Sequence, residues 1–65
     1  MKMRTITQDD LEQLHTLAEE QDLVTARRAR VLLMAKEDHD RESICLALGL
    51  SERTIRDIVR RFNEA

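Results

Sequence analysis

The sequence is poor in the residues that bend or end helices. Among its 65 residues there is no proline and only one glycine, Gly49. These two residue types are the least favourable ones in the interior of a helix, so their scarcity permits helices along most of the chain. The composition therefore predicts an all-α protein.

Aromatic side chains and cysteines are also nearly absent. Phe62 is the only aromatic residue, which argues against a reader of RNA or single-stranded DNA, because such proteins stack bases on aromatic rings. Cys45 is the only cysteine, which excludes an internal disulfide and fits a reducing compartment. Cys45, His15 and His39 do not have the spacing of metal ligands, and we expect neither a metal nor another cofactor.

The sequence has no apolar run long enough to cross a membrane and no secretory signal. We therefore expect a cytoplasmic protein with no membrane partner and no small-molecule ligand. Residues 1–65 are expected to form a single small domain, and a domain of this size is only marginally stable alone. Because disulfides and metals are not expected, self-association as a homodimer is the remaining source of stability.

Charge is distributed unevenly along the chain, although the formal net charge is only −2. Residues 1–25 carry two basic and six acidic side chains, a balance of −4. Residues 26–65 carry nine basic and seven acidic side chains, a balance of +2. Binding to nucleic acid depends on the local patch, so the second part of the chain is compatible with DNA binding.

The first helix is predicted over about residues 8–20. Thr7 is a suitable N-cap, and Asp10 completes a shortened capping box. Its apolar positions recur at helical spacing and are Leu11, Leu14 and Leu17. This stripe packs either on the protein's own core or on a second copy, and we take it as the candidate dimerisation surface. Residues 1–5 are expected to be a loose tail.

The second helix is predicted over about residues 24–37, with Asp22 or Thr25 as its cap. Its C-terminal half is apolar on nearly all sides, which is typical of a helix at the centre of a small core. Its first half carries arginines that we expect to form salt bridges with acidic residues at the end of the first helix. These arginines are Arg27, Arg28 and Arg30, and the acidic residues are Glu19, Glu20 and Asp22.

Residues 40–63 have the pattern of a helix-turn-helix. Asp40 is the expected cap of a third helix over 41–48, and Gly49 is expected to end that helix in a left-handed conformation. Ser51 is the expected cap of a fourth helix over 52–63. The apolar residues that would join the two helices are Ile44, Leu48, Leu50, Ile55 and Ile58. The predicted fold is a three-helix, homeodomain-like core over about 24–63, preceded by an acidic amphipathic helix.

Two segments, ARRARVLLMA (26–35) and ICLALGLSERTIRDIVRRF (44–62), resemble a known family. They are similar to the helix-turn-helix heads of transposases from mariner-related insertion sequences and of small homeodomain-like prokaryotic regulators. The resemblance covers slightly more than half of the chain. It implies that the helix after Ser51 enters the major groove of DNA and that the preceding helix crosses the phosphate backbone.

The sequence departs from the family pattern in three respects. Cys45 occupies a position that is usually alanine, and acidic residues surround the start of the third helix, where a phosphate is expected. In addition, the acidic triad that these transposases use for strand transfer lies in a downstream domain, which this sequence does not contain. We therefore expect no enzymatic activity.

The solvent-facing side of the fourth helix is the candidate DNA-reading surface. Arg53 and Arg56 are the candidates for base contacts, since a bidentate arginine–guanine contact discriminates by about 1–3 kcal/mol. Arg60 and Arg61 are assigned to phosphates. The complete predicted DNA-binding set is Ser51, Arg53, Thr54, Arg56, Asp57, Arg60 and Arg61.

These arginines have an alternative use in ion pairs along the helix. Three pairs have i,i+4 spacing: Glu52–Arg56, Asp57–Arg61 and Arg60–Glu64. Each such pair is worth only about 0.2–0.5 kcal/mol and could yield to DNA. Asp57 either orients a neighbouring arginine or accepts a hydrogen bond from cytosine.

The sequence leaves three functions open. The first is a small transcriptional regulator that binds double-stranded DNA as a homodimer on a palindromic site. The second is the isolated DNA-binding head of a transposase, for which a monomer would suffice. The third is a protein-binding adaptor or DNA mimic that uses its acidic first helix.

Overall fold

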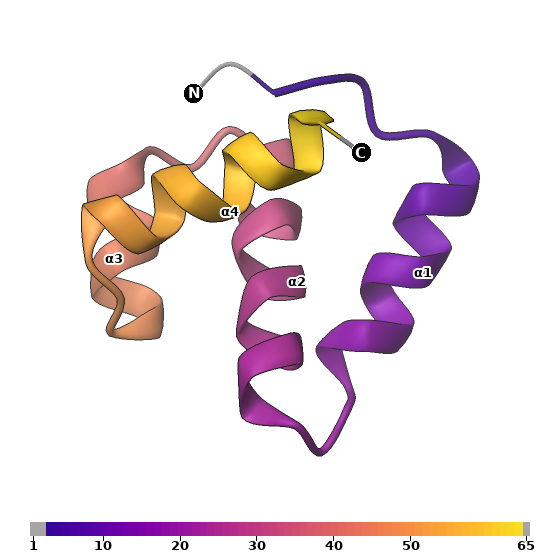
Figure 1. Ribbon diagram of the computed structural model, residues 1–65, viewed down its shortest axis with the longest axis horizontal. Coiled ribbons are helices and arrows are strands. Elements are labelled where there is room, and N and C mark those ends of the chain that lie inside the picture. The colour runs from indigo at the N-terminus through magenta and orange to yellow at the C-terminus, as the bar shows by residue number, and fades with distance from the viewer. Residues whose placement is uncertain (1–2, 65) are drawn as a thin grey trace.

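The computed structural model describes residues 3–64, which form four α-helices and no β-strand (Figure 1). The all-α fold predicted from the sequence is therefore confirmed. In chain order the helices are α1 (Gln8–Ala18), α2 (Leu23–Lys36), α3 (Arg41–Leu48) and α4 (Glu52–Glu64).

The first two helices begin at side-chain caps. The Thr7 hydroxyl accepts a hydrogen bond from the Asp10 backbone N–H, and the Asp10 carboxylate accepts one from the Thr7 backbone N–H, both at 3.1 Å. This is the predicted capping box. Asp22, rather than Thr25, caps α2 by accepting from the N–H of Val24 at 3.0 Å. With the cap at Asp22, α2 starts and ends one residue earlier than predicted, and α1 ends two residues earlier.

The last two helices begin and end as predicted, except that α4 extends by one residue. The Asp40 carboxylate accepts from the N–H of Ser43 at 2.8 Å, and the Ser51 hydroxyl accepts from the N–H of Thr54 at 3.2 Å. Gly49 ends α3 with a left-handed φ of 67°. Only glycine adopts this conformation without steric penalty, so the corner between α3 and α4 depends on Gly49.

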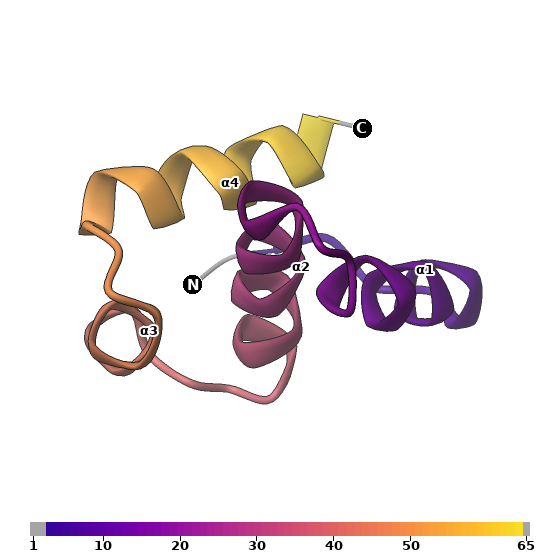
Figure 2. The ribbon, with the colours of Figure 1, turned by 90° about the horizontal axis from the view of Figure 1, so that it is seen from below.

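Helix α2 is the central support of the fold, as its apolar C-terminal half predicts. It packs against α1, α3 and α4, whereas α1 packs against no described helix except α2 (Figure 2). The fully buried side chains are Val31 of α2, Ile44 of α3 and Ile55 of α4. The rest of the buried core consists of Leu14, Ala29, Leu32, Ile58 and Val59.

The apolar stripe of α1 faces mainly into this core. Leu14 is only 6% exposed and packs within the core cluster, and Leu11 is half-buried. Leu17 is 37% exposed and is the member of the stripe most available to a partner. The sequence allowed this stripe to pack either on the protein's own core or on a second copy. Leu14 packs on the protein's own core.

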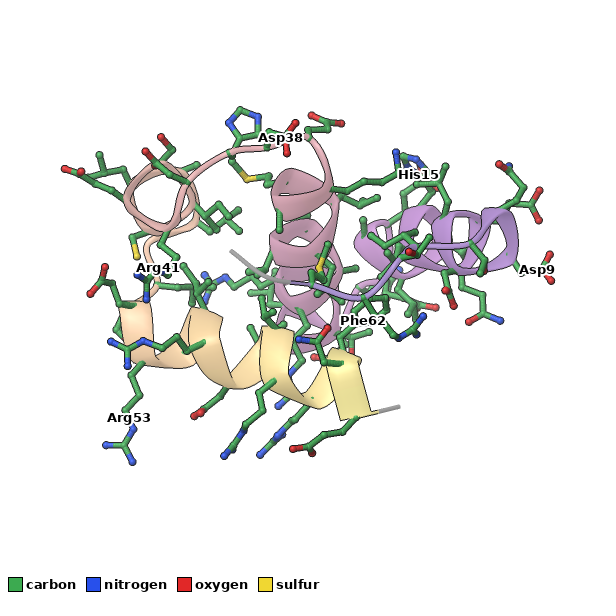
Figure 3. All side chains as sticks on the ribbon, turned by 90° about the horizontal axis from the view of Figure 1, so that it is seen from above. Asp9, His15, Asp38, Arg41, Arg53 and Phe62 are labelled. Carbon is green, nitrogen blue, oxygen red and sulfur yellow. The ribbon has the colours of Figure 1, made fainter. Side chains whose placement is uncertain are left out.

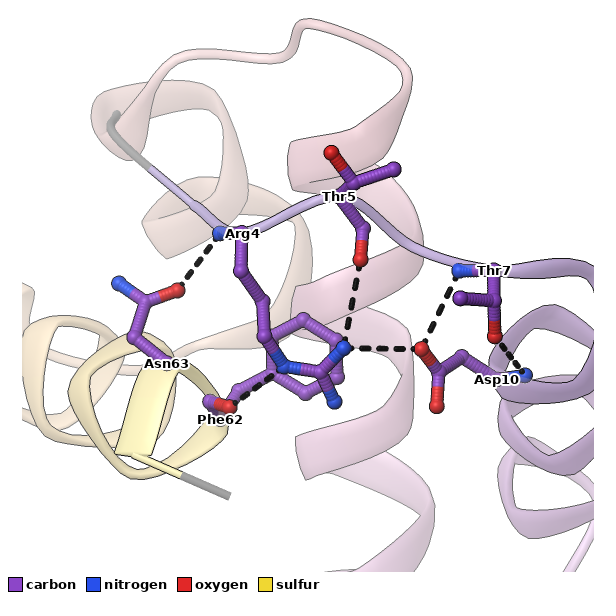
Figure 4. Close-up of polar contacts among 6 residues, drawn as sticks. All are labelled: Arg4, Thr5, Thr7, Asp10, Phe62 and Asn63. Carbon is purple, nitrogen blue, oxygen red and sulfur yellow. Dashed lines mark hydrogen bonds and ion pairs between the residues drawn. The ribbon is translucent and has the colours of Figure 1, made fainter.

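The expectation of a loose N-terminal tail is wrong for Met3, Arg4 and Thr5. The Arg4 guanidinium lies over the Phe62 ring, with its Cζ 3.8 Å from the ring centroid, and its Nε donates to the Phe62 carbonyl at 3.0 Å (Figure 4). Its Nη1 also pairs with the Asp10 carboxylate at 2.9 Å. The segment therefore joins the end of α4 to the start of α1. Residues 1 and 2 of the expected tail lie outside the described residues.

Candidate nucleic-acid interface

Helix α4 has one buried side and one side that faces solvent. Ile55, Ile58 and Val59 are buried against the rest of the protein, and Phe62 is half-buried beneath Arg4. Side chains at the intervening positions must point outward, because residues three and four apart share a face of a helix. The core contacts of α4 therefore determine which of its residues are presented to a partner.

The arginines of α4 lie on the exposed side, and most of them have no internal partner. Arg53 projects away from the body of the protein at the start of α4 (Figure 3). Within the described part of the chain, the side chains of Arg53, Arg56 and Arg61 make no hydrogen bond and no ion pair. None of the three i,i+4 pairs that the sequence allows is formed there. Three guanidinium groups are thus available to a partner without breaking an internal contact.

Asp57 pairs with Arg60 instead. The Asp57 Oδ1 atom lies 3.5 Å from the Arg60 Nη2 atom, one turn further along the helix. Both side chains remain about half or more exposed, at 49% and 65%. An exposed pair of this kind contributes about 0–1 kcal/mol, so DNA could displace it at little cost. The arginine that Asp57 contacts is therefore Arg60.

The two hydroxyl groups at the start of α4 contact each other. The Ser51 and Thr54 side-chain oxygens are 3.0 Å apart, and the Ser51 hydroxyl also caps the helix. Both residues are exposed. The hydroxyls are therefore held at the N-terminus of α4, where the helix dipole favours a negatively charged group.

An open groove runs between the start of α3 and the side of α4. Three arginines reach it, Arg41 from α3 and Arg56 and Arg60 from α4. The remaining lining residues are Asp40, Asp57, Val59 and Asn63. Arg41 lies between the two helices (Figure 3). The sequence did not predict that Arg41 and Arg56 line the same groove, because Arg41 precedes Arg56 by fifteen positions and belongs to another helix.

Two acidic residues near the start of α3 lie at different places relative to α4. Asp38 lies on the opposite side of the protein from α4 (Figure 3). Asp40 does line the groove, but its carboxylate caps α3. The hydrogen bond from the Ser43 backbone N–H lowers the pKa of Asp40 below its ordinary value. Asp40 is thus held as an anion and contacts the helix that it caps.

The groove brings together only part of the predicted site. Arg56, Asp57 and Arg60 line it, whereas Arg53 and Arg61 do not. Those two arginines lie elsewhere on the exposed side of α4, so the candidate interface is the outer face of this helix together with the groove at its flank. We call this set of residues the α4 face: Arg41, Ser51, Arg53, Thr54, Arg56, Asp57, Arg60 and Arg61.

Other kinds of site find no support in the described residues. No group of three or more histidine, cysteine or acidic side chains is arranged to hold a metal ion within residues 3–64. In the same part of the chain, no helix is both long enough and apolar enough to cross a membrane. Cys45 is half-buried and packs against the core, as expected of a small apolar residue.

Comparison with known protein families gives a match over more than half of the chain. The family described as winged helix-turn-helix matches residues 28–65, which include most of α2 and all of α3 and α4. The matched stretch thus contains the α4 face and leaves out α1. The chain has no significant match among curated proteins or among solved structures.

Proposed function

The chain belongs to the winged helix-turn-helix family of DNA-binding domains, and from this premise we propose that it binds double-stranded DNA through the α4 face. Helix α4 takes the place of the recognition helix in the major groove, and α3 lies beside the phosphate backbone. A domain of this family is a binding module, and we assign no reaction to it.

The observation that carries the proposal is the exposed, unpaired state of three of the four arginines of α4. Arg53, Arg56 and Arg61 are exposed and form no ion pair within the described residues. Arginines that serve only to stabilise a helix surface are expected to pair with their acidic neighbours, and Glu52 stands four positions before Arg56. Unpaired guanidinium groups on one face match the requirements of phosphate and base recognition.

We divide the α4 face by role. Arg53 and Arg56, near the start of α4, would contact base edges, since the N-terminal residues of a recognition helix reach them first. Arg60 and Arg61, nearer its end, would contact phosphates. Arg41 would contact a phosphate from the other side of the groove, as expected if α3 lies beside the phosphate backbone of DNA. Thr54 and Ser51 would supply hydroxyl contacts at the helix start.

We further propose that the protein is a transcriptional regulator and that it acts as a homodimer on a near-palindromic site. A single recognition helix reads only a few base pairs, so two copies are needed for adequate specificity. In this proposal residues 1–65 act as one domain, with the helix-turn-helix at 40–63. A transposase head would use the same face, but on a transposon end and without the need for a second copy.

Selection of bound sequences from a random duplex library tests this proposal. We expect an enriched palindrome with two equivalent half-sites. Arg53→Ala and Arg56→Ala should each relax the preference at a different position of the half-site, by about 1–3 kcal/mol of discrimination. Recovery of a single, non-palindromic site would support the transposase alternative, and failure to enrich any sequence would contradict sequence-specific binding.

A further inference from the structure

The corner between α1 and α2 exposes apolar side chains that the core does not use. Leu23 is 67% exposed and Val24 is 57% exposed, and both lie in the first turn of α2. Leu17, in the last turn of α1, is 37% exposed. Leu17 also lines a shallow groove on α1 together with Glu12, Gln13 and Thr16. Single exposed leucines are common on protein surfaces, but several exposed apolar side chains at one corner indicate a contact site.

Opposite charges flank this apolar group. On the α1 side lie Glu19 and Glu20, whose carboxylates have no partner among the described residues. On the α2 side lie Arg27 and Arg28, each one helical turn beyond Leu23 and Val24 and therefore on the same face. The salt bridges predicted between these two groups within one chain are not formed.

Two other charged residues of this corner have partners within the chain. Arg30, which is the third arginine of this segment, donates to the Ala18 carbonyl at 3.3 Å and so closes the end of α1. Asp22 is occupied as the cap of α2, and hydrogen bonds from the Thr25 hydroxyl and the Val24 N–H lower its pKa, with a smaller contribution from the charge of Arg28. Glu19, Glu20 and Arg27 are left exposed.

We propose that this corner is a docking surface for a second copy of the same chain. The arrangement acid–apolar–base is complementary to itself. A two-fold axis through Leu23 would place the acidic flank of each copy against the basic flank of the other and bring the apolar groups together.

The proposed surface is compatible with DNA binding. The α1–α2 loop lies at the end of α2 that is remote from its crossing with α4 (Figure 1). Two copies joined at this corner therefore keep both α4 faces free. This inference assigns a contact surface to the proposed homodimer. The function of that surface in DNA binding rests on the proposed function. Nearly all of the surface precedes residue 28, where the family match begins, so it is a feature of this chain rather than of the matched domain.

A charge-exchange experiment tests the inference. One variant carries Glu19→Arg and Glu20→Arg, and the other carries Arg27→Glu and Arg28→Glu. Each should be monomeric alone, because like charges would face each other across the two-fold axis. An equimolar mixture should form a heterodimer, because both flanks of the mixed pair are again complementary. Sedimentation equilibrium of the wild-type chain, of each variant and of the mixture measures this directly, with circular dichroism as the check on folding.

A second pair of substitutions examines the apolar centre. The double variant Leu23→Ser, Val24→Ser should have a dimer dissociation constant at least about tenfold higher than that of the wild type. Its helical content should stay the same, because both side chains are exposed. A wild-type chain that is monomeric at every concentration, or variants that associate as the wild type does, would overturn the inference. Binding of the same variants to a duplex with a single half-site separates the two proposals. It would persist if only the dimer surface were wrong, and it would be absent if the α4 face did not bind DNA.

Discussion

At the scale of single residues, several polar side chains of this protein serve to start helices. Asp10, Asp22 and Asp40 accept backbone hydrogen bonds at the starts of α1, α2 and α3. Arg53 and Arg56, by contrast, have no partner among the described residues. Residues with satisfied hydrogen bonds therefore maintain the fold, and the arginines without partners on α4 are the ones available for recognition.

The capping carboxylates predict how stability depends on pH. The Ser43 N–H lowers the pKa of Asp40 in the folded protein, so the contribution of Asp40 is fully present above the ordinary carboxyl pKa of about 4. It is lost as the pH falls through the lower, folded value. Asp40→Asn keeps a capping oxygen but has no charge to lose, so its melting temperature should be close to that of the wild type at pH 7 and should decline less below about pH 4.

Thermal melts from pH 7 to pH 2 would measure this difference. Glu42→Gln is the matched control, since Glu42 lies in the same turn of α3 and makes no hydrogen bond within the described residues. Its pH profile should follow that of the wild type. Equal acid sensitivity of Asp40→Asn and the wild type would show that this cap does not contribute to the acid response.

At the scale of helices, the contact between the N-terminal segment and α4 is the least expected feature. Helices α1 and α4 do not pack against each other, and Arg4 connects them by contacting Asp10, Phe62 and Asn63. Its bond to the Phe62 carbonyl also satisfies an acceptor in the last turn of α4, where a cation is favoured by the helix dipole.

Arg4→Ala should therefore lower the free energy of unfolding by about 1–3 kcal/mol, through loss of the charged hydrogen bond and the contact with the Phe62 ring. Urea denaturation measures this change. Arg53→Ala is the control, because Arg53 is exposed and has no partner in the described residues, and its effect should stay within about 0.5 kcal/mol. Equal stabilities of the two variants would mean that the Arg4 contacts contribute nothing in solution.

The sequence predicted the helix caps but not the contacts between residues that are far apart in the chain. The starts of α1, α3 and α4 and the Gly49 corner were predicted, and the start of α2 was predicted to within one residue, because a cap and its acceptor or donor are separated by two or three residues. The contacts of Arg4 were not, since Phe62 and Asn63 follow it by 58 and 59 positions. For the same reason the sequence identified Arg56 and Arg60 as site residues but not Arg41, which joins them only through the packing of α3 on α4.

Ion pairs on α4 were also beyond the reach of sequence spacing. Asp57 has arginines both three and four positions ahead, and it pairs with the nearer one, Arg60. Both spacings place side chains on the same helix face, so the choice depends on side-chain conformation rather than on sequence.

At the scale of the whole molecule, a helical core supports two surfaces that differ in charge, the α4 face and the α1–α2 corner. Helix α2 and the core hold α4 so that its arginines face outward (Figure 3). The α1–α2 corner combines acidic, apolar and basic groups and is suited to a second copy. This separation explains how a chain with a net charge of −2 is compatible with DNA binding, because the local charge of the α4 face differs from the average.

The central claim, that the α4 face binds double-stranded DNA, is tested most directly by a salt titration of binding to a duplex. The logarithm of the binding constant should fall linearly with the logarithm of the salt concentration, with a slope of about −0.9 for each phosphate neutralised. Arg53→Ala and Arg56→Ala should each weaken binding about tenfold or more, whereas Lys36→Ala, an exposed charge at the end of α2, should not. Binding without a steep salt dependence, or binding that survives both arginine substitutions, would contradict the claim.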